Sequence, residues 1–187
     1  MYEYLSSWTG VNQRPAPGAL KNTGQINQIL LGQTTFNHDA HKSEAAQTFA
    51  GLTSEFEQKV KEGMVKGPLY RLCQLTPDQQ QSFVVGKNYT SPCFEAYSKI
   101  RLEPGNNFAA ANTRLVIIDP VVPGVDLTRF NPQQEEILIR PGMFWAVTHV
   151  RTSLTNNAVQ EIGLQYIGTT ETDAIRATGI AKHVGLL

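Results

Sequence analysis

The stretch Asn131–Val147, N-P-Q-Q-E-E-I-L-I-R-P-G-M-F-W-A-V, decides how the rest of the sequence is interpreted. Its polar opening leads through Glu135 and Glu136 into the β-prone run Ile137–Ile139, and a Pro-Gly pair precedes a second apolar run, Met143–Val147. Two apolar runs joined by such a turn are typical of a β-hairpin. Glu136 then stands where a loop enters a strand, a position that holds a catalytic carboxylate rigidly. A solvated pair of glutamates at a strand end explains the same pattern.

Length and composition favour some classes of protein and partner over others. The chain has 187 residues, enough for one domain with a sizeable core or for a small domain with an extension. Sixteen basic and sixteen acidic residues cancel, so the net charge favours neither nucleic acid nor an anionic membrane. No apolar run approaches the roughly 20 residues of a membrane span, and no classical signal peptide begins the chain. Cys73 and Cys93 fit no metal-ligand spacing and predict buried or free thiols. We expect a soluble protein that uses no metal.

The N-terminal part differs from the rest. Residues 1–37 are rich in Gly, Pro, Asn, Gln, Thr and Ser without sustained periodicity, which predicts an irregular N-terminal extension. Ala40–Met64 places apolar residues three and four positions apart, which predicts an amphipathic helix. We expect a single domain over residues 38–187.

Short strands dominate the remainder. Thr113–Asp119 is an almost unbroken apolar run typical of a buried strand, and Ala158–Gly168 alternates apolar and polar residues. Phe94–Leu102 is interpreted as a helix that Pro104-Gly105 stops. A helix followed by many short strands predicts an α+β fold with two packed, mainly antiparallel sheets.

Arg71 lies inside an apolar run, Leu69–Leu72, that predicts a short strand. A buried arginine needs an anionic partner, because desolvating the charge alone is strongly unfavourable. The partner is either a structural carboxylate or a ligand phosphate. Further along, Tyr89–Ser91 predicts another strand, which ends at Pro92.

Three separated pieces resemble, in order and spacing, the motifs of the mono-ADP-ribosyltransferases. Leu69-Tyr70-Arg71 is similar to the strand arginine of that family. Tyr89-Thr90-Ser91-Pro92-Cys93 resembles its aromatic-Thr-Ser-Thr-Ser strand, with only the first serine kept. The closing block, Leu115–Ile139, resembles the family's apolar strand, Gly-x-Asp turn and Gln-x-Glu motif, the last formed by Gln134 and Glu136. The resemblance covers residues 65–150.

This resemblance implies an ADP-ribosyltransferase fold, NAD as the co-substrate without a metal, and a macromolecular acceptor, most simply a protein. It implies that Glu136 is the catalytic carboxylate, that Arg71 binds the NAD phosphates and that Ser91 hydrogen-bonds Glu136. Leu72 and Phe108 are expected beside the nicotinamide. The chemistry agrees, because cleaving the nicotinamide–ribose bond builds positive charge that a carboxylate stabilises. The sequence contains no Gly-x-Gly-x-x-Gly motif, so nothing suggests a Rossmann-type mode of NAD binding.

Two further residues concern the acceptor. Family members that modify arginine usually carry Glu where this chain has Gln134, so the resemblance implies an acceptor other than arginine. Phe130 resembles the aromatic with which the family's substrate loop meets its target, although an aromatic that anchors the loop fits equally well. We expect Gln134 and Phe130 to take part in recognition.

Alternatives remain within the same resemblance. Water in place of the acceptor gives an NAD glycohydrolase. Leu72, Pro92 and Cys93 depart from the family pattern, which leaves a catalytically degenerate binding module open. Small stand-alone members of the family are commonly toxins or effectors. This implies a virulence role, with secretion or delivery into the cytoplasm of a target cell without a classical signal peptide.

Overall fold

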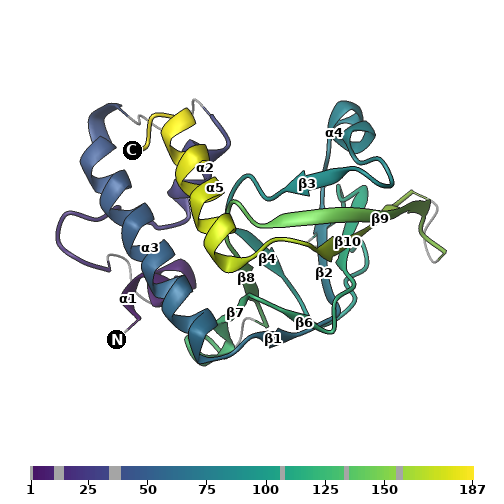
Figure 1. Ribbon diagram of the computed structural model, residues 1–187, viewed down its shortest axis with the longest axis horizontal. Helices are drawn as coiled ribbons and strands as arrows, with labels where there is room; N and C mark the ends of the chain where they lie inside the picture. The colour runs from purple at the N-terminus through teal and green to yellow at the C-terminus, as the bar shows by residue number, and fades with distance from the viewer. Residues whose placement is uncertain (1, 11–14, 34–38, 106–107, 133–134, 155–157) are drawn as a thin grey trace.

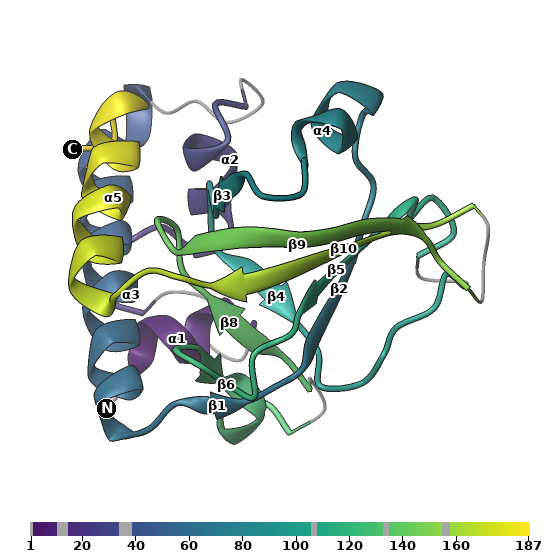
Figure 2. The same ribbon diagram turned by 45° about the vertical axis from the view of Figure 1, so that its right-hand side comes forward.

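The computed structural model describes residues 2–10, 15–33, 39–105, 108–132, 135–154 and 158–187. Most of the helices gather at one end of the molecule, and the strands extend away from them, with the short helix α4, Pro77–Ser82, on the strand side (Figure 1). The long helix α3, Lys42–Glu62, and the C-terminal helix α5, Thr170–His183, lie side by side across that end (Figure 2). The molecule therefore has the α+β architecture that the sequence predicts.

The predicted amphipathic helix is confirmed as α3, whose buried face includes Phe49, Leu52 and Phe56. Helix α4, Pro77–Ser82, begins with a capping box in which the Thr76 hydroxyl accepts the Gln79 amide. None of the helices in the described residues is long and apolar enough to cross a membrane.

Part of the segment 1–37 is helical rather than irregular. It contains α1, Glu3–Trp8, and α2, Gln25–Leu30, and their apolar side chains join the same core as α3. Each helix has only six residues, too few for a periodic pattern to stand out in a sequence. Packing on the core stabilises helices that would be marginal alone.

The strands form three sheets. The five-stranded sheet has the order β2 (Leu69–Cys73), β5 (Thr113–Ile117), β10 (Gln160–Tyr166), β9 (Phe144–Thr152), β3 (Asn88–Thr90). The three-stranded sheet has the order β4 (Glu95–Tyr97), β8 (Ile137–Ile139), β7 (Val125–Asp126), and β1 (Val65–Lys66) pairs with β6 (Val121–Val122). Short 3-10 turns, η1 (Asp39–His41) and η2 (Leu127–Arg129), precede α3 and follow β7. All strand pairs are antiparallel except the parallel pair of β5 with β10.

The expected hairpin between Ile137–Ile139 and Met143–Val147 is wrong. Strand β8 pairs with β4 and β7, whereas β9 pairs with β10 and β3, so the Pro-Gly turn carries the chain from one sheet to the other. Helix α5 packs on this turn: a Cβ on Gly142 would lie 2.4 Å from the Asp173 carbonyl oxygen and 2.5 Å from the Ala177 nitrogen. A hairpin and a corner between sheets share one sequence pattern, and the packing of α5 distinguishes them.

The helix expected over Phe94–Leu102 is also wrong, since this segment contains β4. Ala96 pairs with Leu138 and Tyr97 with Ile137. Pairing with a buried neighbouring strand outweighs a modest local helix preference.

Replacing Gly142 with alanine should destabilise the fold. Its φ of +86° disfavours a side chain, and the added Cβ would collide with the backbone of α5. We expect the free energy of unfolding in urea to fall by about 1–3 kcal/mol. Gly179→Ala, in α5 with open space around the new Cβ, is the matched control and should be neutral or stabilising. Equal stability of both variants would contradict the close packing of α5 on the turn.

Candidate functional site

Four of the predicted site residues line one cleft of about 710 Å³: Arg71, Leu72, Phe108 and Glu136. Leu72 is buried in its wall, while Phe108 is 39% exposed at its edge. The other lining residues are Ala96, Tyr97, Ser98, Ile100, Leu102, Pro132 and Glu135. The cleft thus lies where β2, the end of β4 and the start of β8 meet.

Strand β4 brings the two charged residues to the same cleft. At its end, the Tyr70 and Ser98 backbones exchange two hydrogen bonds of 2.8 Å, which link β4 to the strand that carries Arg71. Its other edge pairs with β8. Continuing that register by one pair places Ser98 opposite Glu136. One short strand therefore sets the placement of Arg71 relative to Glu136.

The Arg71 guanidinium is held from behind. Its Nη1 donates to the Ala96 carbonyl oxygen at 3.1 Å. Burial lowers the pKa of Arg71, and the buried Glu95 carboxylate together with Tyr97 and the two cysteines raises it, so the net shift is upward and the guanidinium stays charged. Glu95 is itself fixed by the Tyr89 hydroxyl, at 2.8 Å. The structure thus supplies the carboxylate expected for a buried arginine and still leaves Arg71 at the cleft.

Glu136 directly precedes β8, as the sequence predicts. Its carbonyl oxygen accepts the Leu127 amide at 2.9 Å, and its Oε1 accepts the Trp8 indole N–H at 2.9 Å. Its neighbour Glu135 is exposed. A partly buried carboxylate with one oxygen held by an indole N–H suits an electrostatic role in the cleft.

The expected hydrogen bond from Ser91 to Glu136 is wrong. Ser91 is fully buried, donates to Glu95 Oε2 at 3.0 Å and accepts the Trp145 indole N–H at 2.9 Å. Strand β3, which ends just before it, is the edge of the five-stranded sheet next to β9. The serine that lines the cleft is Ser98, which lies inside the segment interpreted from the sequence as a helix.

The acceptor residues are placed only in part. Phe130 packs against the Tyr2 ring, with ring centroids 6.1 Å apart, and against the core. This contact is the one expected of an aromatic that anchors its loop. Gln134 lies outside the described residues. Recognition by either residue stays a prediction.

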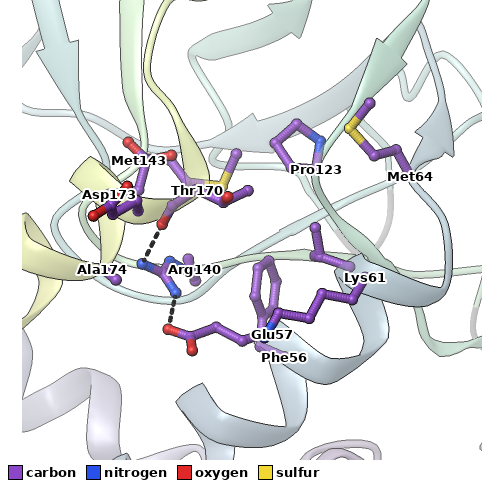
Figure 3. Close-up of a pocket in the computed structure, with 12 residues that line it drawn as sticks. Phe56, Glu57, Lys61, Met64, Pro123, Arg140, Met143, Thr170, Asp173 and Ala174 are labelled. Carbon is purple, nitrogen blue, oxygen red and sulfur yellow. Dashed lines mark hydrogen bonds and ion pairs between the residues drawn. The ribbon is translucent and has the colours of Figure 1, made fainter.

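A second cavity, of about 520 Å³, lies between α3 and α5 (Figure 3). Its buried cation, Arg140, donates to Glu57 Oε1 at 2.7 Å and to the Thr170 carbonyl oxygen at 3.4 Å. These contacts join the two helices and neutralise the guanidinium. Since the described residues that line this cavity include none of the predicted site residues, the Arg71–Glu136 cleft is the candidate active site.

The two cysteines and the potential metal ligands of the described residues give no evidence of another reactive or metal site. Cys73 and Cys93 are free, as predicted, and burial raises the pKa of Cys73 to about 11 and that of Cys93 to about 12. Such thiols are poor nucleophiles at neutral pH. Over the described ranges, no cluster of three or more His, Cys, Asp or Glu side chains is arranged to hold a metal ion.

No family profile and no curated protein matches the chain. Solved structures do. The ADP-ribosyltransferase HopU1 of Pseudomonas syringae superposes with a TM-score of 0.60 at 20% identity, over 77% of this chain and 64% of HopU1. The type III effector XopAI of Xanthomonas axonopodis gives 0.62 at 16% identity, over 88% of this chain and 62% of XopAI. The ADP-ribosyltransferase Vis of Vibrio splendidus, in complex with agmatine, gives 0.61 at 13% identity, over 91% and 75%.

These similarities show that the chain has the ADP-ribosyltransferase fold. The chain spans less than two thirds of the length of HopU1 and XopAI. The fold that the motif resemblance implied is therefore confirmed.

Ser91→Ala tests the corrected role of this serine. The substitution leaves the Trp145 N–H and one Glu95 oxygen without their buried partner, so the free energy of unfolding should fall by about 1–3 kcal/mol. Denaturant unfolding measures the change. Ser82→Ala, on an exposed helix end, is the control and should have little effect. Unchanged stability of Ser91→Ala would contradict the buried network.

Proposed function

We propose that this chain cleaves the nicotinamide–ribose bond of NAD and transfers ADP-ribose to a macromolecule, most simply a protein. The observation that carries the proposal is the placement of Arg71 and Glu136 on one cleft within an ADP-ribosyltransferase fold. The cleft volume lies within the range of about 300–1,000 Å³ that is typical of ligand sites. No metal takes part in the proposed reaction.

Glu136 supplies the catalytic charge. As the bond between ribose C1 and the nicotinamide nitrogen breaks, its electron pair leaves with nicotinamide and positive charge develops on the ribose. The carboxylate holds the ribose 2-hydroxyl and stabilises that charge, an effect of about 3 kcal/mol or more for one preorganised group. The acceptor then attacks C1 and loses a proton.

Arg71 binds the pyrophosphate. A planar guanidinium offers paired N–H groups to phosphate oxygens, and Glu95 behind it keeps the group charged and oriented. Leu72 and Phe108 give the apolar surface against which nicotinamide packs. Ser98 lines the same cleft, and the β4–β8 register continued by one pair sets it opposite Glu136, which makes it a candidate partner for the ribose.

The acceptor and the setting are inferred more broadly. HopU1 and Vis are ADP-ribosyltransferases and XopAI is a type III effector, which favours a toxin or effector role for this chain, delivered into a target cell. An NAD glycohydrolase would use the same residues with water as the acceptor. Incubating the protein with labelled NAD and a cell lysate separates the two, because transfer labels macromolecules and hydrolysis releases ADP-ribose.

Glu136→Gln should keep the fold and lower the rate of nicotinamide release by about a hundredfold or more, the scale of losing one transition-state contact. Glu135→Gln, the neighbouring and more exposed carboxylate, is the matched control and should lose far less activity. Nicotinamide released from NAD by the purified variants is the measurement. An essential Glu135 beside a dispensable Glu136 would show that the catalytic assignment is wrong.

Gln134 should set the acceptor. A neutral amide lacks the charge-assisted hydrogen bonds that hold a guanidinium, so agmatine, which Vis binds in its crystal structure, should be a poor acceptor here. Gln134→Glu should increase transfer to agmatine and leave NAD cleavage largely intact, whereas Gln134→Ala should lose transfer more than hydrolysis. Free nicotinamide and acceptor-bound ADP-ribose are measured together. Efficient transfer to agmatine by the wild type would refute the assignment.

A further inference from the structure

The Glu136 carboxylate is held by a residue 128 positions away in the chain. The Trp8 indole, on the N-terminal helix α1, donates its N–H to Glu136 Oε1 at 2.9 Å. Ser91, the residue expected to orient Glu136, is hydrogen-bonded to Glu95 and Trp145 instead. Among the described residues, the side chain that orients the Glu136 carboxylate is therefore Trp8 of α1.

The indole approaches Glu136 without occupying the cleft. Trp8 is not among the described residues that line the cleft, and its ring packs on Phe94, with ring centroids 5.6 Å apart. Phe94 directly precedes β4 and is itself buried. An N–H on Oε1 fixes the plane of the carboxylate and leaves Oε2 for a ligand in the cleft.

Helix α1 is seated firmly on α3. The Glu55 carboxylate accepts the amides of Glu3 at 2.8 Å and Leu5 at 2.9 Å, so it caps the start of α1. The Leu5 side chain is fully buried. These contacts fix the position from which α1 extends toward Glu136.

Gly51 makes room for this seat. The Tyr4 ring lies so close to α3 that a Cβ on Gly51 would come within 2.3–2.6 Å of three of its atoms. A glycine inside a helix costs about 0.5–1 kcal/mol relative to alanine. The close approach of Tyr4 is a structural reason for a glycine at this position of α3.

We infer that α1 is a component of the active site and that Trp8 is a positioning residue for Glu136. The inference rests on the proposed NAD cleavage. Trp8 holds the carboxylate in the rotamer that meets the ribose, and Gly51 and Glu55 hold α1 in the place that allows it. Docking of α1 therefore controls the rate of the bond-breaking step and leaves the phosphate site at Arg71 intact.

Trp8→Phe is the direct kinetic test. It removes the N–H donor and keeps an aromatic ring on Phe94. We expect kcat for nicotinamide release to fall about ten- to a hundredfold, the scale of a small misplacement of a catalytic group. The KM for NAD should stay within about twofold, because Arg71 is untouched. An unchanged kcat would overturn the inference.

Gly51→Ala tests the same idea without touching Trp8. The methyl group must displace the Tyr4 ring from α3, which loosens the seat of α1, so kcat should fall in the same direction as in Trp8→Phe. Gly179→Ala is the matched control, since its Cβ meets nothing within 4 Å, and it should keep full activity. Full activity in Gly51→Ala would contradict the coupling between α1 and Glu136.

A spectroscopic measurement tests the hydrogen bond independently of catalysis. The chain has two tryptophans, so the indole N–H signals in a nuclear magnetic resonance spectrum are assigned by their loss in Trp8→Phe. Glu136→Gln should shift the Trp8 signal and leave that of Trp145 in place, and Glu135→Gln should shift neither. An unmoved Trp8 signal in Glu136→Gln overturns the inference. If Glu136→Gln shifts the Trp8 signal but the wild-type protein releases no nicotinamide from NAD, the hydrogen bond stands and the proposed function is overturned.

Discussion

The backbone bridge between Tyr70 and Ser98 is the contact on which the candidate site depends. It fastens the end of β4 to the strand that carries Arg71, while the other edge of β4 pairs with β8, which Glu136 precedes. Neither charged residue is near the other in sequence, and neither sheet alone contains both. Because backbone pairing leaves little freedom of register, the cleft between them is defined before any ligand binds.

The carboxylates of Glu95 and Glu136 differ in burial and therefore in their electrostatic roles. Glu95 lies behind Arg71, bound by Tyr89 and Ser91, and raises the arginine pKa against the effect of desolvation. Glu136 lies at the cleft with one oxygen bound by Trp8. The buried carboxylate keeps the Arg71 guanidinium charged, and in the proposed reaction the more accessible Glu136 would meet the developing positive charge. This division suits a reaction in which a ligand with two phosphates loses a neutral leaving group.

The sequence predicts whatever depends on local pattern. Helix α3, the Arg71 strand and the position of Glu136 before β8 follow from periodicity, burial logic and motif order. The partner of Ser91 could not be predicted, because a three-residue strand such as β4 leaves no distinguishable period and its pairing is nonlocal. The Trp8–Glu136 contact had no sequence signal either, since α1 is a six-residue helix stabilised by docking on α3. Gly51 was the nearest clue, as an unfavourable residue inside a strong helical pattern.

Calorimetric titration of NAD into the wild-type protein and Arg71→Lys tests the central claim, that the cleft between Arg71 and Glu136 is an NAD site. Lysine keeps the charge but not the planar fork that grips two phosphate oxygens. The account predicts saturable binding to the wild type and affinity about tenfold or more weaker in the variant, the scale of one charge-assisted hydrogen bond. Equal affinities in the two proteins, or a wild type that does not bind NAD, would contradict it.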